Sequence, residues 1–177
     1  MIETPNLLLI PCELPHFEAI LREPAELASM LRVSLADDWL GFPAANEVMQ
    51  PSYDYLKSNP SVLGWWTYLF IHAADHRLIG LGGFKGAPDI GGVVEIGYAI
   101  APAYRGRGLA TEAASGMMKY AFSHPQVSRV DAHTLPERNH STRVLERVGM
   151  RYMGVVTDPE DGDVWHWSVR REEYNCP

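Results

Sequence analysis

Residues 93–122 constrain this chain more than any other segment, because a strand-like stretch, a basic glycine-rich loop and a helix-like stretch follow one another there. The loop contains Arg105, Gly106, Arg107 and Gly108, and apolar residues at helical spacing begin at Leu109. The first turn of a helix has unpaired N–H groups and the positive end of the helix dipole, so it attracts anions. Glycines let the backbone approach a ligand, and arginines bind phosphate in bidentate geometry. The sequence therefore predicts a binding site for a phosphorylated ligand.

The size and composition of the chain indicate one globular domain over residues 1–177. Hydrophobic residues make up 46% and charged residues 21% of the chain, which is typical of globular proteins. The formal net charge of −7 disfavours a general nucleic-acid binder and favours a cationic partner such as an amine. Cys12 and Cys176 form neither a metal-ligand spacing nor a disulfide framework, so we expect no metal. We expect a cytoplasmic protein without a membrane partner, because the N-terminus lacks the basic residues of a signal peptide and no apolar run reaches the ~20 residues of a membrane span.

The hydrophobic pattern predicts an α+β, or mixed α/β, fold around one sheet. Three strands in the middle of the chain are joined by short links, which favours an antiparallel meander. Pro24 and Pro51 are expected to interrupt the two helical segments of the first half, and Asp161-Gly162 predicts a hairpin turn. The expected strands are residues 6–11, 65–73, 78–85, 93–100, 127–135, 150–157 and 164–170, and the expected helices are residues 14–34, 47–59, 109–122 and 141–148.

The loop lacks two common phosphate-binding motifs. A P-loop requires Gly-Lys followed by Ser or Thr, and Gly-Lys does not occur in the chain. A dinucleotide-binding fingerprint requires Gly or Ala three residues after its second glycine, where this chain has Thr111. The pattern that remains is Arg-x-x-Gly-x-Ala, formed by Arg105, Gly108 and Ala110.

A second motif follows further along the chain. Residues 134–150 read Thr-Leu-Pro-Glu-Arg-Asn-His-Ser-Thr-Arg-Val-Leu-Glu-Arg-Val-Gly-Met. Together, the two motifs resemble the GNAT superfamily of N-acetyltransferases, in the branch that contains the ribosomal-protein N-terminal acetyltransferases. The resemblance is dense from about residue 80 to residue 154. Over residues 1–65 it extends only to the general layout.

This resemblance implies a mostly antiparallel sheet of about six to seven strands, splayed in the middle and flanked by helices. Residues 1–65 would form the acceptor side, and residues 66–177 would form the coenzyme A-binding core. Acetyl-CoA would be the co-substrate, with its pantetheine arm in the gap between the splayed strands and its pyrophosphate on the loop. Asn139 would contact the coenzyme arm, cap the following helix, or do both. The residues expected to bind coenzyme A are Ile100, Ala101, Arg105, Gly106, Arg107, Gly108, Leu109, Ala110, Thr111 and Asn139.

The resemblance also implies direct transfer, in which an amine attacks the thioester. Glu95 is the expected general base, and the alternative is an exposed strand residue that pairs with an arginine. Many members have a tyrosine acid where this chain has Leu145, so Ser141 is expected either to act as the acid or only to cap its helix. The residues expected near the acceptor are Asp37, Asp38, Trp39 and His133. The alternatives are a solvated loop for the first three and a core or surface histidine for the last.

Three functions remain open from the sequence. The first is an acetyl-CoA-dependent N-acetyltransferase that acts on a primary amine, either a protein N-terminus or a small molecule. The second is a GNAT-fold module that binds coenzyme A without transfer, which the leucine at position 145 keeps open. The third is a phosphate-loop protein unrelated to coenzyme A, such as a nucleotide binder. Exposed strands and tryptophans also allow a homodimer.

Overall fold

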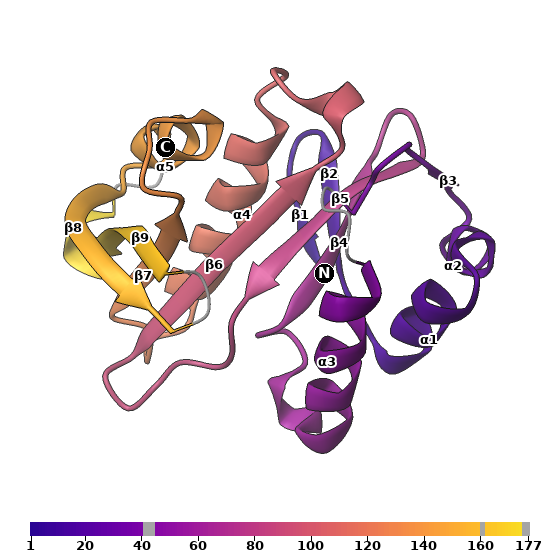
Figure 1. Cartoon of the computed structure of the whole chain (residues 1–177), viewed down its shortest axis with the longest axis horizontal. Coiled ribbons are helices and arrows are strands. Elements are labelled where there is room, and N and C mark those ends of the chain that lie inside the picture. The colour runs from indigo at the N-terminus through magenta and orange to yellow at the C-terminus, as the bar shows by residue number, and fades with distance from the viewer. Residues whose placement is uncertain (41–44, 160–161, 175–177) are drawn as a thin grey trace.

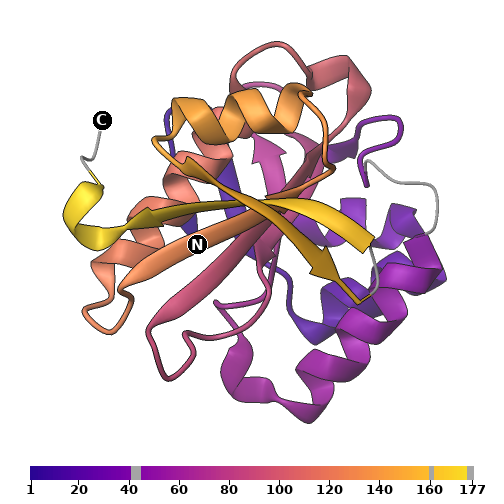
Figure 2. The same ribbon diagram turned by 60° about the vertical axis from the view of Figure 1, so that its left-hand side comes forward.

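One sheet flanked by helices makes up the fold, in a computed structural model that describes residues 1–40, 45–159 and 162–174 (Figure 1). Cys176 and Asp161 lie outside the described residues. The strands are β1 (Ile2–Glu3), β2 (Leu7–Pro11), β3 (Ser34–Leu35), β4 (Thr67–His72), β5 (Arg77–Phe84), β6 (Val93–Ile100), β7 (Arg129–Thr134), β8 (Arg151–Asp158) and β9 (Gly162–Arg170). The α-helices are α1 (Leu14–Arg22), α2 (Pro24–Leu31), α3 (Ala45–Ser58), α4 (Leu109–Ser123) and α5 (His140–Arg147). Figures 1 and 2 show α4 and α5 on one side of the sheet and α1, α2 and α3 on the other.

The sheet is mostly antiparallel, which confirms the predicted fold class. Its strand order is β1-β2-β4-β5-β6-β7-β9-β8, and β3 pairs with β5 outside this path. Only the β3–β5 and β6–β7 pairs are parallel among the described strands. The meander of β4, β5 and β6 is confirmed, as is the β8–β9 hairpin. The seven longer strands match those expected, whereas β1 and β3 are two-residue strands too short to leave a pattern in the sequence.

The sheet splays between β6 and β7. These two strands pair only from Val93 opposite Arg129 to Glu95 opposite Asp131. Beyond Glu95, β6 continues to pair with β5 as far as Ile100, while β7 pairs with β9 on its other edge. The expected parting of the two strands is therefore confirmed, and it begins one residue after Glu95.

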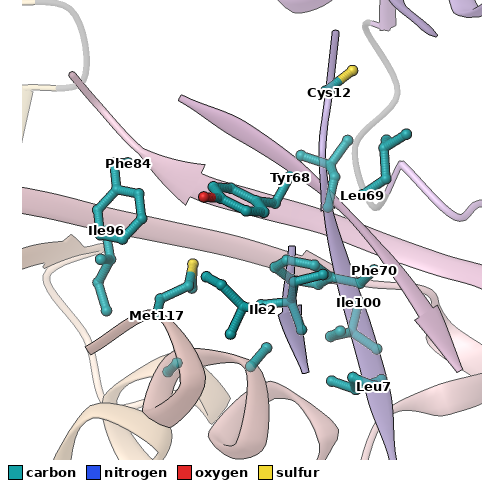
Figure 3. Close-up of a cluster of buried hydrophobic side chains, with 14 of the residues drawn as sticks. Ile2, Leu7, Cys12, Tyr68, Leu69, Phe70, Phe84, Ile96, Ile100 and Met117 are labelled. Carbon is teal, nitrogen blue, oxygen red and sulfur yellow. The ribbon is translucent and has the colours of Figure 1, made fainter. Parts of the chain in front are cut away.

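Side chains of the sheet and of α4 form a core that fixes the loop in place. Tyr68 and Phe70 from β4 and Ile96 and Ile100 from β6 lie on the face of the sheet that α4 covers with Met117 (Figure 3). Met117 is fully buried, and replacing such a buried methionine by alanine costs about 2–5 kcal/mol of stability. Helix α4, and with it the loop at its start, is thereby fixed against β6.

Two expected helix features differ in the structure. The first helical segment breaks at Pro24 as predicted, but it ends at Leu31 rather than near Ser34. Arg32 adopts a left-handed conformation with φ +55°, after which Ser34 pairs with β5. The interruption expected at Pro51 was wrong, because α3 runs through this residue. Met49 and Leu56, on either side of the proline, are both buried, so tertiary packing stabilises the helix there.

The described residues contain no helix with both the length and the apolar character needed to cross a bilayer. Over the same residues, no group of three or more His, Cys, Asp or Glu side chains is arranged to hold a metal ion.

Candidate active site

Gly106 and Gly108 give the basic loop its shape. Their φ angles are +74° and +81°, in the left-handed region that residues with a Cβ atom rarely adopt. A Cβ atom at either position would meet nothing within 4 Å, so the loop backbone is open to an approaching ligand. Gly108 directly precedes α4, and the unpaired N–H groups of the first helical turn therefore face the loop.

A pocket of about 300 Å³ connects the loop with helix α5, and we call it the phosphate cradle. Arg105 reaches it from the loop, and His140, Arg143 and Arg147 reach it from α5. No carboxylate belongs to its described lining, so three guanidinium groups and a helix N-terminus favour an anion there. The remaining lining residues are Ile100, Tyr104, Gly106, Gly108, Leu109, Ala110, Thr111 and Val144.

Sequence reasoning missed the contribution of α5 to this cradle. Arg143 and Arg147 are four residues apart and so lie on one face of their helix, which is a signal that the sequence contained. Only the packing of α5 beside α4 shows that this face meets the loop.

The two arginines of the loop have different roles. Arg105 lines the cradle, and its Nε donates a hydrogen bond of 2.9 Å to the carbonyl oxygen of Ile100. Arg107 is expected to bind the same ligand, but it does not line the cradle. Its guanidinium carbon, Cζ, lies 4.7 Å from the centre of the Tyr104 ring. The Tyr104 hydroxyl donates a 2.7 Å hydrogen bond to Asp75, which holds the pKa of this carboxyl below its usual value. Burial and the same hydrogen bond raise the pKa of Tyr104. The Tyr104–Asp75 hydrogen bond connects the start of the loop to the turn between β4 and β5.

Every second backbone N–H group of β6 points into the gap between β6 and β7. The Ala101 N–H donates a 2.7 Å hydrogen bond to the carbonyl oxygen of Ile79, so this expected donor faces β5 and is already engaged. Successive residues of an antiparallel strand point their N–H groups to opposite edges. The N–H groups of Ile100 and Tyr98 therefore point toward β7, into the gap.

Asn139 and Ser141 lie at the start of α5. Asn139 caps the helix: its Oδ1 accepts a 3.1 Å hydrogen bond from the Thr142 N–H, and the Thr142 side chain completes the capping box. Ser141 lies inside the helix and does not cap it. Its carbonyl oxygen accepts a long hydrogen bond of 3.4 Å from the hydroxyl of Tyr98. Burial raises the pKa of Tyr98, so its phenol stays protonated.

Glu95 lies at the last paired position before the gap, and its partners are a lysine and a histidine rather than an arginine. Its Oε1 is 2.6 Å from Nζ of Lys85 and 3.0 Å from Nδ1 of His133. The side chain is 23% exposed, so the carboxylate remains accessible. The His133 ring stacks on His166 with a centroid distance of 5.1 Å. The structure thus brings together Glu95 and His133, two of the predicted site residues.

The comparisons with known proteins agree with this geometry. Residues 7–151 match the family model described as acetyltransferase (GNAT) domain. The chain belongs to the GNAT family of acetyltransferases. It is 24% identical over 169 residues to the uncharacterized N-acetyltransferase YjdG of Bacillus subtilis strain 168, which covers 94% of this chain and 96% of that protein.

Solved structures share the GNAT fold of this chain. A spermidine N-acetyltransferase SpeG chimera from Vibrio cholerae and hSSAT has a TM-score of 0.69 at 18% identity, covering 96% of this chain and 98% of that one. RimL, a ribosomal L7/L12 alpha-N-protein acetyltransferase solved with coenzyme A, has a TM-score of 0.67 at 15% identity, covering 94% and 95% of the two chains.

The trio Asp37, Asp38 and Trp39, expected near the acceptor, does not meet the other predicted site residues. Trp39 is 6% exposed and belongs to the core. The two aspartates are exposed and follow Ala36, whose N–H is bonded to Leu78 near the far end of β5 from Glu95. None of the three lines the cradle, and none lines the groove between α3 and the sheet.

A groove of about 320 Å³ separates α3 from the sheet, and we call it the apolar groove. Met49 of α3 and Trp66 form part of its walls, and Gly97 of β6 forms part of its floor. Lys85, the partner of Glu95, belongs to the same lining. Sequence reasoning did not predict this groove, because its residues come from four separate segments of the chain.

Proposed function

We propose that this GNAT protein transfers the acetyl group of acetyl-CoA directly to a primary amine. The observation that carries the proposal is the continuity of the site. The phosphate cradle lies at one end of β6, the gap between β6 and β7 follows, and Glu95 stands where the gap begins. A coenzyme held by its diphosphate in the cradle would therefore extend its thioester toward a carboxylate.

The residues of the cradle fit a diphosphate. Arg105, Arg143 and Arg147 supply positive charge, and Gly106 and Gly108 leave the backbone N–H groups open. Leu109, Ala110 and Thr111 begin α4 and would add the N–H groups of its first turn. Arg107 would act indirectly, through its contact with Tyr104.

The gap would hold the pantetheine arm and the thioester. The N–H groups of Tyr98 and Ile100 point into it and would donate hydrogen bonds to carbonyl groups there, including the developing oxyanion. The amide of Asn139 would bond the arm with its remaining N–H groups, because Oδ1 is used in the helix cap.

Glu95 would accept the proton of the attacking amine. An alkylammonium has a pKa of about 10.4, so most acceptors need a base at neutral pH. The new bond forms between the amine nitrogen and the acetyl carbon, the C–S bond breaks, and the coenzyme leaves as a thiolate. A thiol has a pKa of about 8.5, so the departing thiolate requires little acid catalysis. The Ser141 hydroxyl would protonate it.

Two measurements test this proposal. Calorimetric titration compares acetyl-CoA, coenzyme A and ATP, and we expect both coenzymes to bind more tightly than ATP. A thiol-release assay with a panel of primary amines then measures transfer. We expect Glu95→Gln to lower kcat by roughly 100-fold or more while acetyl-CoA binding is unchanged. Glu146→Gln, on the exposed side of α5, is the matched control.

Each outcome assigns a function. Tighter binding of ATP would contradict the proposal. Binding of acetyl-CoA without thiol release from any amine would favour the coenzyme A-binding module instead.

A further inference from the structure

The apolar groove lies on the same face of β6 as Glu95. Side chains alternate along a strand, so Glu95 and Gly97 point to one face, while Ile96 points to the α4 side (Figure 3). Lys85 lines the groove and lies 2.6 Å from the Glu95 carboxylate. Glu95 itself lines the adjoining pocket, which shares Lys85 with the groove. A molecule seated in the groove would therefore approach Glu95 past Lys85.

Gly97 keeps the floor of the groove open. A Cβ atom at this position would meet nothing within 4 Å. Gly97 has no positive φ angle, so a larger side chain is compatible with its backbone. A side chain placed there would project into the groove.

The groove offers apolar contacts and no place for a second cation. Its walls include the side chains of Met49, Trp66 and Leu81. Lys85 is the one charged residue among its described lining, and it already pairs with Glu95. A cationic tail would be desolvated here without a carboxylate to bind it, which is unfavourable.

We infer that the acceptor is a primary amine attached to an apolar group, which occupies this groove while the amine reaches Glu95. This inference rests on the proposed function and assigns its substrate class. Two sources share the chemistry: a peptide whose first residue is apolar, and a free amine such as 2-phenylethylamine. The inference excludes a polyamine as the preferred acceptor, because its second ammonium would lie in the groove.

Acceptor kinetics at saturating acetyl-CoA test the inference. The panel contains peptides that begin with Leu, Phe, Ser or Lys, together with 2-phenylethylamine and spermidine. We expect kcat/KM for the best apolar acceptor to exceed that for spermidine by about 10-fold or more. The peptides and the free amine separate the two sources. A preference for spermidine or the Lys peptide would overturn the inference.

Two variants link the preference to the groove. Gly97→Leu should lower kcat/KM for apolar acceptors by about 10-fold or more and leave the Kd for acetyl-CoA unchanged. Val48→Asp adds a carboxylate to the rim, where Val48 is 44% exposed, and should raise spermidine activity relative to 2-phenylethylamine. Met30→Asp, at a 48% exposed position of α2 outside the groove, is the matched control. An equal effect of Gly97→Leu on all acceptors, or no shift with Val48→Asp, would contradict the inference.

A measurement of amine binding tests this inference separately from the proposed function. If no amine is acetylated, calorimetry of 2-phenylethylamine with the coenzyme A-bound protein still decides. Binding that Gly97→Leu abolishes would support the groove as an apolar amine site, although the proposed function would have failed. Absence of binding would overturn the inference.

Discussion

Oε1 of Glu95 lies 3.0 Å from Nδ1 of His133, although the β6–β7 register pairs Glu95 with Asp131, two residues before His133. The imidazole therefore fixes the direction of the proposed base from the neighbouring strand. We expect His133→Ala to lower kcat by about 10-fold, since a hydrogen bond to a charged group contributes roughly 1.5–3 kcal/mol.

The matched variant for this prediction is His133→Asn, whose amide N–H can take the place of Nδ1. It should restore most of the activity, and KM for acetyl-CoA should stay constant in both variants. Steady-state kinetics check this split. A rise in KM with unchanged kcat would show that His133 acts on coenzyme binding instead.

The hydrogen bond from Tyr104 to Asp75 should support coenzyme binding by holding the loop in place. Tyr104→Phe removes only the hydroxyl and leaves the ring under Arg107. We expect KM for acetyl-CoA to rise by about 3- to 10-fold with little change in kcat, because the loop loses its tie to the β4–β5 turn. Tyr55→Phe, at a residue of α3 that is 42% exposed, serves as the control. An unchanged KM would show that the loop holds its shape without this contact.

The arginines of α5 should contribute charge to the cradle. Arg143→Ala and Arg147→Ala should each weaken acetyl-CoA binding by about 10-fold, and the loss should shrink at high salt because screening weakens the wild-type contacts. Arg151→Ala is the control, since Arg151 pairs with Glu173 at 2.9 Å and does not line the cradle. Calorimetric titration at two salt concentrations measures both effects. Equal affinity in all three variants would remove α5 from the site.

Glu112 should make stability depend on pH. Burial opposes its ionisation, but hydrogen bonds from Thr4 and Asn6 outweigh this and lower the pKa of the carboxyl. A lowered pKa stabilises the fold above the unfolded-state value of about 4.3, and the gain is lost as the pH falls through the folded-state pKa. Glu112→Gln should therefore lower Tm at pH 7, and the difference from wild type should shrink in acid. Glu172→Gln, at a 76% exposed side chain, should show no such difference. A Tm difference for Glu112→Gln that does not change with pH would contradict this account.

The parts of the site that are contiguous in the sequence could be predicted, and the parts that depend on packing could not. Residues 105–111 follow one another, so their glycines, arginines and helix start identified the loop directly. Arg143 and Arg147 stand on one helix face, but the sequence does not say which element that face meets. Asp37, Asp38 and Trp39 have suitable chemistry for an amine, yet Trp39 is used in the core.

Very short strands and unusual backbone conformations also could not be predicted from the sequence. A two-residue strand such as β1 leaves no periodic pattern, and the left-handed Arg32 ends α2 without a glycine. The direction of the Ala101 N–H follows from the register of β5 and β6, which no local pattern fixes.

The affinity of Gly108→Val for acetyl-CoA, measured by calorimetry beside that of Gly162→Val, decides whether the loop binds the coenzyme. Both glycines have similar φ angles, +81° and +73°, and open space around the Cβ position, so the two substitutions impose similar strain. Only Gly108 lies where a diphosphate would contact the backbone. We predict that Gly108→Val binds at least about 10-fold more weakly than wild type, while Gly162→Val keeps wild-type affinity. Equal affinity of wild type and Gly108→Val would contradict the assignment of this loop as the coenzyme site.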